Sequence, residues 1–376
     1  MFDRRLIENW DWILVLLLVL IAACSVLNLY SATFQIREMG GAQVFLKQLY
    51  WYLIGFAFFL LMTTFDYSIL KQVAYPLYLI AVGLLIFVLI KGRTISGSQR
   101  WISLGPVSFQ VAELAKIAVV LALARYFSEG ERFQEYGWRD LVPPLVLIGI
   151  PAGLILKEPD LGTTLHLVIS ALSMILFLKI NWKSVAVLAV PAVGVVAPLI
   201  WFKLKPYQKN RILTFLSPDM DPLGAGYHIN QSKIAIGSGQ LWGKGYLKGT
   251  QTRLHFLPEQ HTDFAFSVFA EEWGFFVSVL LLLLYFFLVL WCLNIAKIAK
   301  NKFGSLLTVG IAAILFWEAV INVAMVTGLL PVVGIPLVLF SYGGSSLVTT
   351  MAAMGILMNI SMRRFMFSEG AGLPRK

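Results

Sequence analysis

The run Leu280-Leu-Leu-Leu-Leu-Tyr-Phe-Phe-Leu-Val-Leu-Trp291 places only apolar and aromatic residues in succession, and Trp12–Leu20 is a second run of this kind near the start of the chain. A soluble domain offers no partner large enough to bury such runs. A bilayer does, because about 20 apolar residues cross its hydrocarbon core as one helix. The two runs therefore indicate a membrane protein.

The composition extends this reading to the whole chain. Of its 376 residues, 59% are hydrophobic and 13% are charged, where a soluble domain carries roughly 25% charged residues. This composition argues against the alternative, a soluble protein with one large core. We predict an all-α polytopic membrane protein in a single domain, residues 1–376, with about ten transmembrane helices. The expected spans are 12–33, 46–65, 69–91, 110–127, 140–157, 160–180, 182–204, 262–294, 304–330 and 343–362.

The orientation follows from Lys and Arg, which concentrate in the short cytoplasmic loops of membrane proteins. With both termini inside, the inner segments hold 15 of these residues and the short outer segments hold 6. The loop near 203–262 is long enough to be exempt from the rule. We therefore predict cytoplasmic termini and an extracytoplasmic long loop.

The net charge of +10 could suggest a nucleic-acid partner. Half of the basic residues flank helices on the predicted cytoplasmic side, where anionic lipid headgroups attract them, so no nucleic-acid partner is expected. Cys24 and Cys292 both fall within apolar segments, and the histidines lack the spacing of zinc ligands. We predict neither a disulfide nor a protein metal site.

Three outer connections differ from simple loops. Residues 91–110 contain Gly and Pro, which break a helix, and place Arg100 beside Trp101. Residues 203–262 are polar but include apolar stretches such as Tyr227–Ile236, which predicts short helices in the headgroup layer. Residues 328–346 are apolar yet broken by Pro and Gly. Because irregular backbone at membrane depth must be buried in protein or line a cavity, we predict a re-entrant segment there.

Several ionisable residues lie at or near the outer ends of the predicted spans. A charge at the bilayer centre costs about 2.5–3.5 kcal/mol on insertion scales, so its presence points to function. Glu113 and Lys116 are three residues apart on one helical face, Asp160 lies in a tight turn, and Asp263 opens the eighth predicted helix. The structural alternatives are an ion pair for Glu113 with Lys116 and a helix N-cap for Asp263.

Glu271 and Glu272 lie deeper in the same predicted helix as Asp263. Adjacent helical residues point about 100° apart, so at most one of these two carboxylates can face a common cavity.

The chemistry of such a cavity can be predicted in outline. Basic groups at the outer surface suit a polyanionic headgroup, and broken helices leave room for lipid tails. A carboxylate near them could accept a proton from a hydroxyl, while Arg and Lys neutralise a leaving diphosphate. Two functions are compatible with these residues. The protein could transfer a group from a lipid-linked diphosphate to an alcohol, or it could transport that lipid.

Six motifs stand out along nearly the whole chain. They are Gly97-Ser-Gln-Arg-Trp101, Phe109-Gln-Val-Ala-Glu-Leu-Ala-Lys116, Glu158-Pro-Asp-Leu-Gly-Thr163, Asp221–Gly239, Phe256-Leu-Pro-Glu-Gln-His-Thr-Asp-Phe264 and Phe340-Ser-Tyr-Gly-Gly-Ser345. In sequence and in order these motifs resemble the shape, elongation, division and sporulation (SEDS) family, and they are closest to its elongation-type members.

The resemblance implies a peptidoglycan glycosyltransferase that polymerises lipid II at the outer face of the bacterial inner membrane during cell elongation. It also implies a complex with a class B penicillin-binding protein, a transpeptidase, and with other membrane proteins of cell elongation. By family motif Asp263 matches an essential Asp, proposed to deprotonate the attacking sugar hydroxyl. The positions that match the substrate cavity are Glu113, Lys116, Arg100, Asp160, Arg211, Gln231 and Lys233.

The chain departs from the family pattern at two places. Val111-Ala112 stands where Pro-Ser is common, and Glu158 stands where Gln is common. Glu158 adds negative charge close to Asp160, so this turn could raise a carboxylate pKa or attract a cation. A divalent cation, Mg²⁺ or Mn²⁺, near the diphosphate is compatible with this turn, although no residue set requires it.

The expected reaction is displacement at the anomeric carbon of the lipid-linked glycan, with Asp263 as base and undecaprenyl diphosphate as leaving group. An α-linked donor that yields a β-1,4 bond implies inversion, which needs one base and no covalent enzyme intermediate. Two rivals stay open, a lipid II flippase and a non-catalytic scaffold that activates a penicillin-binding protein.

Overall fold

The computed structural model of the protein describes residues 9–34, 44–95, 98–104, 107–129, 135–178, 180–191, 194, 198, 201–202, 206–216, 225–254, 256–257 and 259–364. These residues are mostly helical. The helices are α2 (Trp12–Ala32), α4 (Val44–Thr64), α5 (Tyr67–Lys91), α6 (Val111–Glu129), α7 (Trp138–Lys157), α8 (Leu161–Leu176), α9 (Trp182–Pro191), α11 (Pro206–Leu216), α12 (Ala225–Ser238), α13 (Thr250–Arg253), α14 (Ala265–Ile298), α15 (Lys302–Val326) and α16 (Gly344–Met362).

Seven helices are long and apolar enough to cross a membrane, namely α2, α4, α5, α7, α14, α15 and α16. This confirms a polytopic membrane protein. The described α8 has 16 residues, and α6 carries four charged residues along its length. Of the predicted span 182–204, the structure describes the 10-residue helix α9, and many of the residues after it lie outside the described part. The count of ten spans therefore stays a prediction.

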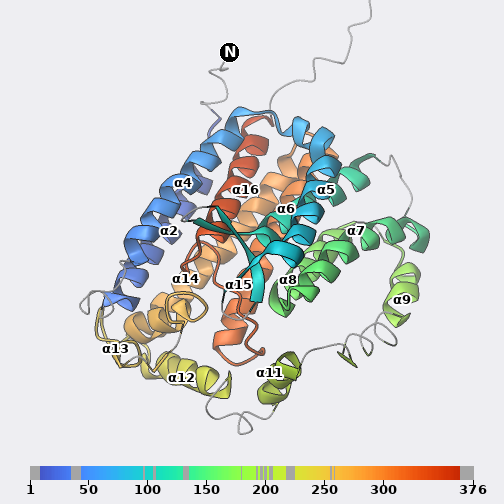
Figure 1. Ribbon diagram of the computed structural model, residues 1–376. Coiled ribbons are helices and arrows are strands. Elements are labelled where there is room, and N and C mark those ends of the chain that lie inside the picture. The colour runs from blue at the N-terminus through green and yellow to red at the C-terminus, as the bar shows by residue number, and fades with distance from the viewer. Residues whose placement is uncertain are drawn as a thin grey trace, which may run out of the picture.

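The helices differ in how far they are enclosed. The apolar windows of α16 and α15 are 83% and 61% buried, whereas those of α4 and α5 are 17% and 28% buried. Figure 1 shows the long helices side by side, with α11, α12 and α13 gathered at their lower end. Apolar side chains that face lipid need no protein partner, so the outer helices can stay half uncovered.

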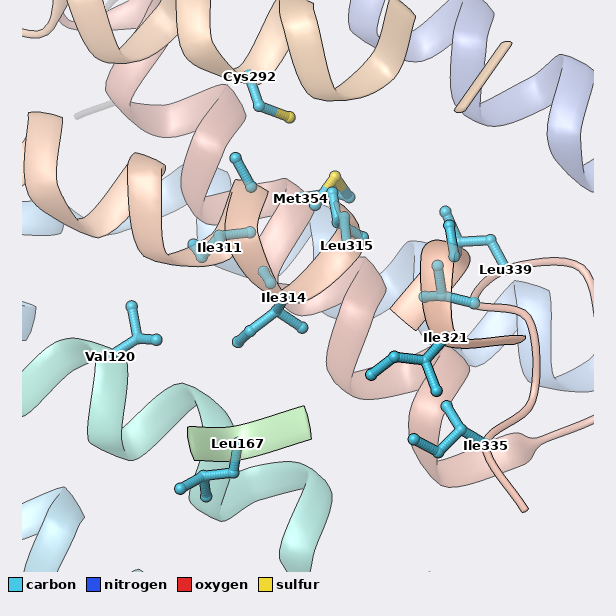
Figure 2. Close-up of a cluster of buried hydrophobic side chains, with 14 of the residues drawn as sticks. Val120, Leu167, Cys292, Ile311, Ile314, Leu315, Ile321, Ile335, Leu339 and Met354 are labelled. Atoms are coloured by element: carbon cyan, nitrogen blue, oxygen red, sulfur yellow. The ribbon is translucent and has the colours of Figure 1, made fainter. Parts of the chain in front are cut away.

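The centre of the bundle is packed by small and branched side chains. Lipid tails are as apolar as Leu, so helices associate in membranes through close van der Waals packing rather than through the hydrophobic effect. Gly310 shows the closeness, since a Cβ there would lie 2.3 Å from Cγ1 of Val120. Figure 2 shows this core, which joins Val120, Leu167, Cys292, Ile311, Ile314, Leu315, Ile321, Ile335, Leu339 and Met354.

The start of α2 and the end of α16 lie at the same end of the bundle. Asp11 caps α2 by accepting a hydrogen bond from the Leu14 amide. Its carboxylate also accepts from Trp291 Nε1 at 2.9 Å and from Ser361 Oγ at 3.0 Å. At the other end of α2, Gln260 Nε2 donates to the Ala32 carbonyl at 2.8 Å. The turn that contains Asp263 therefore lies opposite the described chain ends.

A three-stranded antiparallel sheet connects α5 to α6. Its strands are β1 (Arg93–Ile95), β2 (Ser98–Leu104) and β3 (Val107–Gln110), and Trp101 pairs with Gln110. The prediction of an all-α fold is incomplete here, because strand pairing gives these backbone groups partners where no helix can form. Since β3 continues directly into α6, the sheet fixes Arg100 above the start of that helix.

The predicted helix 262–294 is broken. Gly274 inside α14 has φ 75° and ψ −173°, and a Cβ there would lie 2.2 Å from the Gly243 amide nitrogen. The turn at 239–245 replaces the lost helical bonds, because the Phe275 amide donates to the Gln240 carbonyl at 2.9 Å and the Lys244 amide to the Glu271 carbonyl at 3.0 Å. Glycine at 274 combines the left-handed backbone with this close approach.

The segment between α15 and α16 is irregular and mostly buried. Side chains of the surrounding helices satisfy its carbonyl groups, as buried backbone requires. The pairs are Asn322 to Ile335, Tyr285 to Val338, Tyr52 to Leu339, Ser25 to Phe340 and Gln48 to Ser341. Broken backbone at this place is therefore enclosed by protein.

Candidate active site

Asp160 organises the turn between α7 and α8. One carboxylate oxygen caps α8 by accepting from the Thr163 amide at 3.0 Å. The other accepts from Arg100 Nη1 at 2.9 Å and from Gln110 Nε2 at 3.4 Å. Asp160 is 2% exposed and Arg100 is 24% exposed, so the pair is buried on its acidic side and reaches solvent through the guanidinium.

A small hollow adjoins this pair. Its cavity volume is about 10 Å³, which is close to the least space that holds one water. A diphosphate needs more room, so its entry requires the walls to move. The hollow is lined by Arg100, Pro159, Asp160, Leu161, Gln208, Arg211, Pro331 and Val333. It thus joins β2, the α7–α8 turn, α11 and the irregular segment.

Asp263 lies in a turn before α14. The N-cap position of α14 belongs to Phe264, so the interpretation of Asp263 as an N-cap is wrong. The turn is tied to the irregular segment, because the Tyr342 amide donates to the His261 carbonyl at 2.8 Å. A Cβ on Gly334 would lie 3.4 Å from Asp263 Oδ2, which places the carboxylate against that glycine.

The surroundings of Asp263 keep its proton more firmly than water would. Burial raises the pKa of the Asp263 carboxyl to about 6, and the negative charge of Glu259 adds to the rise. The positive charges of Arg211 and Arg100 oppose this effect. Asp263 is therefore within electrostatic reach of two basic residues of the hollow, and it can act as an acceptor of protons near neutral pH.

Glu158 is a second acid at this turn. It is 1% exposed, and neither carboxylate oxygen has a hydrogen-bond partner among the described residues. Burial and the nearby Asp160 raise the pKa of Glu158 to about 8. The departure from the family pattern at this position therefore places a neutral carboxylic acid beside the Arg100–Asp160 pair at pH 7.

Glu113 and Lys116 belong to a separate, buried centre. Lys116 Nζ lies 3.0 Å from Glu113 Oε1 and 3.5 Å from Glu318 Oε2, and the Lys116 side chain is 4% exposed. Ser346 Oγ donates to Glu318 Oε1 at 3.4 Å. The structural alternative of an ion pair is confirmed, and the pair belongs to a three-member cluster in which two carboxylates contact the ammonium.

Sequence reasoning missed Glu318. Its signal was available, because it is the one acidic residue within the predicted span 304–330 and such residues mark functional sites in membranes. A second missed residue is Asn322, four positions later on the same face of α15. Asn322 is fully buried, and its Nδ2 donates to the Asp263 carbonyl at 2.9 Å.

Gln231 and Lys233 of α12 do not line the hollow. Lys233 is exposed, and its side chain extends over Gly328, where a Cβ would lie 2.1 Å from Lys233 Cε. Among the described residues the structure therefore gathers Arg100, Asp160 and Arg211 around one hollow, with Asp263 in electrostatic reach. It keeps the Glu113–Lys116 pair and the α12 residues apart from them.

Glu271 and Glu272 face different elements, as their spacing predicts. Glu271 Oε1 accepts from Lys244 Nζ at 2.6 Å and from the Thr250 amide at 2.8 Å. Ser31 Oγ donates to Glu272 Oε1 at 2.5 Å. Both acids fasten the long loop and α2 to α14, so they serve the structure of the end of the bundle that contains the Asp263 turn.

A much larger hollow lies elsewhere. It has a volume of about 660 Å³ between α2 and α4, and apolar side chains such as Leu18, Leu53 and Phe56 line it. Both helices are candidate spans, and among the described residues no acidic or basic side chain lines this groove. Charged side chains gather instead at the polar hollow, although that hollow is smaller.

Known proteins resemble the whole chain. Residues 11–365 match the cell cycle protein family FtsW/RodA/SpoVE. The peptidoglycan glycosyltransferase MrdB of Escherichia coli K12 is 41% identical over 96% of this chain and 97% of that protein. The peptidoglycan glycosyltransferase RodA of Treponema pallidum is 32% identical over 96% and 99%.

Two solved structures share the fold. The first is a chain of a peptidoglycan synthase complex, which was solved to describe the structural coordination of polymerization and crosslinking. It matches with a TM-score of 0.81. It is 33% identical and covers 95% of this chain and 99% of its own. The crystal structure of the rod shape determining protein RodA of Thermus thermophilus matches with a TM-score of 0.69 at 30% identity, over 95% and 98%.

Proposed function

The chain belongs to the FtsW/RodA/SpoVE family, and from this membership we infer that its polar end performs the reaction for which its relatives are named. It is a peptidoglycan glycosyltransferase, a multi-pass protein of the inner membrane. The observation that carries the detailed mechanism is that the Asp263 carboxylate lies within electrostatic reach of Arg100 and Arg211, which line one hollow together.

We propose that lipid II is the substrate and that Asp263 is the general base. Its carboxylate takes the proton from the 4-hydroxyl of the acceptor sugar, and this oxygen attacks the anomeric carbon of the lipid-linked glycan. The bond to the diphosphate breaks, and undecaprenyl diphosphate leaves with the electron pair. Inversion at this carbon needs a single base. Arg100 and Arg211 neutralise the charge that develops on the leaving group.

The remaining predicted residues receive supporting roles in this proposal. Asp160 holds Arg100 through their ion pair and thereby orients the guanidinium. Gln231 and Lys233 of α12 contact the substrate outside the hollow, where a long headgroup extends. Glu113 and Lys116 act on the diphosphate only if the cluster with Glu318 opens.

The membrane arrangement is part of the same proposal. A single domain of ten spans with cytoplasmic termini puts the Asp263 turn outside, because that turn lies opposite the start of α2. The loop 203–262 then lies in the outer headgroup layer, and the irregular segment after α15 is re-entrant. The acidic and basic groups of the site meet the lipid II headgroup at its own depth.

The described residues do not offer a ready cage for a divalent cation. They contain no group of three His, Cys, Asp or Glu side chains that could hold a metal, and Asp160 is occupied by Arg100 and Gln110. Magnesium is commonly held by one or two carboxylates together with substrate phosphates. We propose that any Mg²⁺ or Mn²⁺ arrives with the diphosphate, and no part of the mechanism depends on it.

Partners follow from the chemistry of the product. A polymerised strand has to be crosslinked, and the related complex is described as coordinating both activities. We propose that a class B penicillin-binding protein binds this chain, with other membrane proteins of cell elongation, and that no nucleic acid takes part.

A polymerisation assay tests the proposal against a flippase and a scaffold. Purified protein is incubated in detergent with fluorescent lipid II, with and without its transpeptidase partner, and the glycan is separated by gel electrophoresis. We expect a ladder of strands. A flippase makes no polymer in detergent, and a scaffold makes none without a second glycosyltransferase. The absence of strands in both samples would contradict the proposal.

The pH dependence of polymerisation should follow Asp263. A base with a raised pKa near 6 is protonated and inactive below that value, so kcat/KM should rise about tenfold per pH unit up to roughly pH 6. Above about pH 8 the ionised Glu158 should repel the diphosphate and lower kcat/KM. The measurement is a pH–rate profile between pH 5 and 9.

The matched control is Glu158→Gln, which keeps the size of the side chain and cannot ionise. It should retain the rise near pH 6 and lose the decline above pH 8. An alkaline decline that persists in this variant assigns that limb to another group.

A further inference from the structure

We propose that Asn322 is a positioning residue for Asp263. Its side-chain amide ties the backbone of Asp263 to the irregular segment between α15 and α16, which contacts the Asp263 carboxylate. The inference rests on the proposed role of Asp263 as base. Asn322 belongs to α15 and lies outside the six quoted motifs.

Asn322 is fully buried in α15. Its Nδ2 atom donates to the Asp263 carbonyl at 2.9 Å and to the Ile335 carbonyl at 2.7 Å. An amide nitrogen carries two hydrogens, so each hydrogen serves one of the two segments. No other standard side chain of this size donates twice from one atom without carrying a charge.

The first segment carries the Asp263 carboxylate, and the second presents a glycine to it. Ile335 follows Gly334, whose backbone has φ 73° and lies against Asp263 Oδ2. A carbonyl held at Asp263 fixes the Cα from which the carboxylate projects. A carbonyl held at Ile335 fixes the glycine wall. The amide of Asn322 therefore sets the separation between the base and the wall that it faces.

The rate of a reaction that uses a general base depends on the exact position of that base. A displacement of 1 Å at a reacting group can cost about 100-fold in rate, even when the substrate still binds. Other ties hold the turn as well, including the Tyr342 amide to the His261 carbonyl and Gln260 to Ala32. These ties keep the fold, while Asn322 holds the Asp263 residue itself.

The experiment compares Asn322→Leu with a control on the same helix. Thr308→Val removes another fully buried polar group of α15, whose Oγ1 bonds the Gly304 carbonyl within its own helix at 2.8 Å. Steady-state polymerisation by the complex with its transpeptidase partner gives kcat and KM for lipid II. We expect Asn322→Leu to lower kcat about 10- to 100-fold with KM changed less than about threefold, and Thr308→Val to keep both.

A second variant guards against misfolding. Asn322→Gln keeps two hydrogens on one nitrogen but moves them by one methylene, so its kcat should fall between those of the wild type and Asn322→Leu. Melting temperatures in detergent check that all variants fold. Wild-type kcat in both Asn322 variants would overturn the inference, as would a loss shared equally by Thr308→Val.

Different results would contradict the role of Asp263 as base and the role of Asn322 as positioning residue. If Asp263→Asn retains activity, the role of the base is wrong. If Asp263→Asn is inactive while both Asn322 variants turn over normally, only the positioning role of Asn322 is wrong.

Discussion

Asp263→Asn is expected to lower the rate of glycan polymerisation by about 10²- to 10⁴-fold, the range that a positioned general base contributes. The amide has the size of the carboxyl group but accepts no proton at neutral pH. Because burial raises the pKa of Asp263, the ionised side chain is costly to the fold above that pKa. The variant should therefore be at least as stable as the wild type at pH 7.5.

The measurement is strand formation from lipid II by the purified variant. Co-purification with the transpeptidase and the melting temperature serve as controls, and both should be unchanged. Normal glycan output from the purified variant would refute the assignment of Asp263. Loss of output together with loss of partner binding would indicate a folding defect, and Asp263→Glu would then report whether a carboxylate restores any activity.

Lys116→Met should produce the largest loss of stability. The substitution keeps the length of the side chain but leaves Glu113 and Glu318, which are 10% and 1% exposed, without their shared cation. Removing one partner of a buried ion pair costs about 3–5 kcal/mol, because the remaining charge stays desolvated. Thermal unfolding in detergent measures the effect, and turnover of lipid II should weaken as well.

The neutral counterpart of this variant separates charge from packing. In Glu113→Gln/Lys116→Met/Glu318→Gln no buried charge remains, so most of the lost stability should return. Activity then decides the role of the cluster. If the stable triple variant polymerises lipid II normally, the ions serve the structure alone and Lys116 makes no contact with the diphosphate. If it stays inactive, the charge itself is needed.

The helices were predictable because their signal is local. Long apolar stretches mark the spans, and the ends of α2, α5 and α16 lie within two residues of their predicted limits. The break at Gly274 was not predictable, because a single glycine inside a helical pattern is tolerated. Its cause is the turn at 239–245, which approaches from a distant part of the chain.

The site divides in the same way. Asp263, Asp160 and Arg100 stand in motifs, and the structure brings Arg100 and Asp160 to 2.9 Å. Glu318 and Asn322 lie in no motif, and their contacts depend on which face of α15 meets α6 and the Asp263 turn. The partners of Glu318 and Asn322 are therefore set by helix packing, which the local sequence does not reveal. A scan for isolated polar residues inside apolar spans would have found both.

The break in α14 also sets how this helix can enter the membrane during synthesis. The helix of 34 residues is far longer than a bilayer requires, and at 1.5 Å per residue the part from Phe275 to Ile298 is already about 36 Å long. The translocon can therefore insert that part alone and leave the part before Gly274 unconstrained by lipid. The turn at 239–245 precedes this part in the chain, so it is synthesised first. Assembly of the end that contains Asp263 can then be completed after insertion, and an added residue at the break would rotate the Asp263 turn without altering the span.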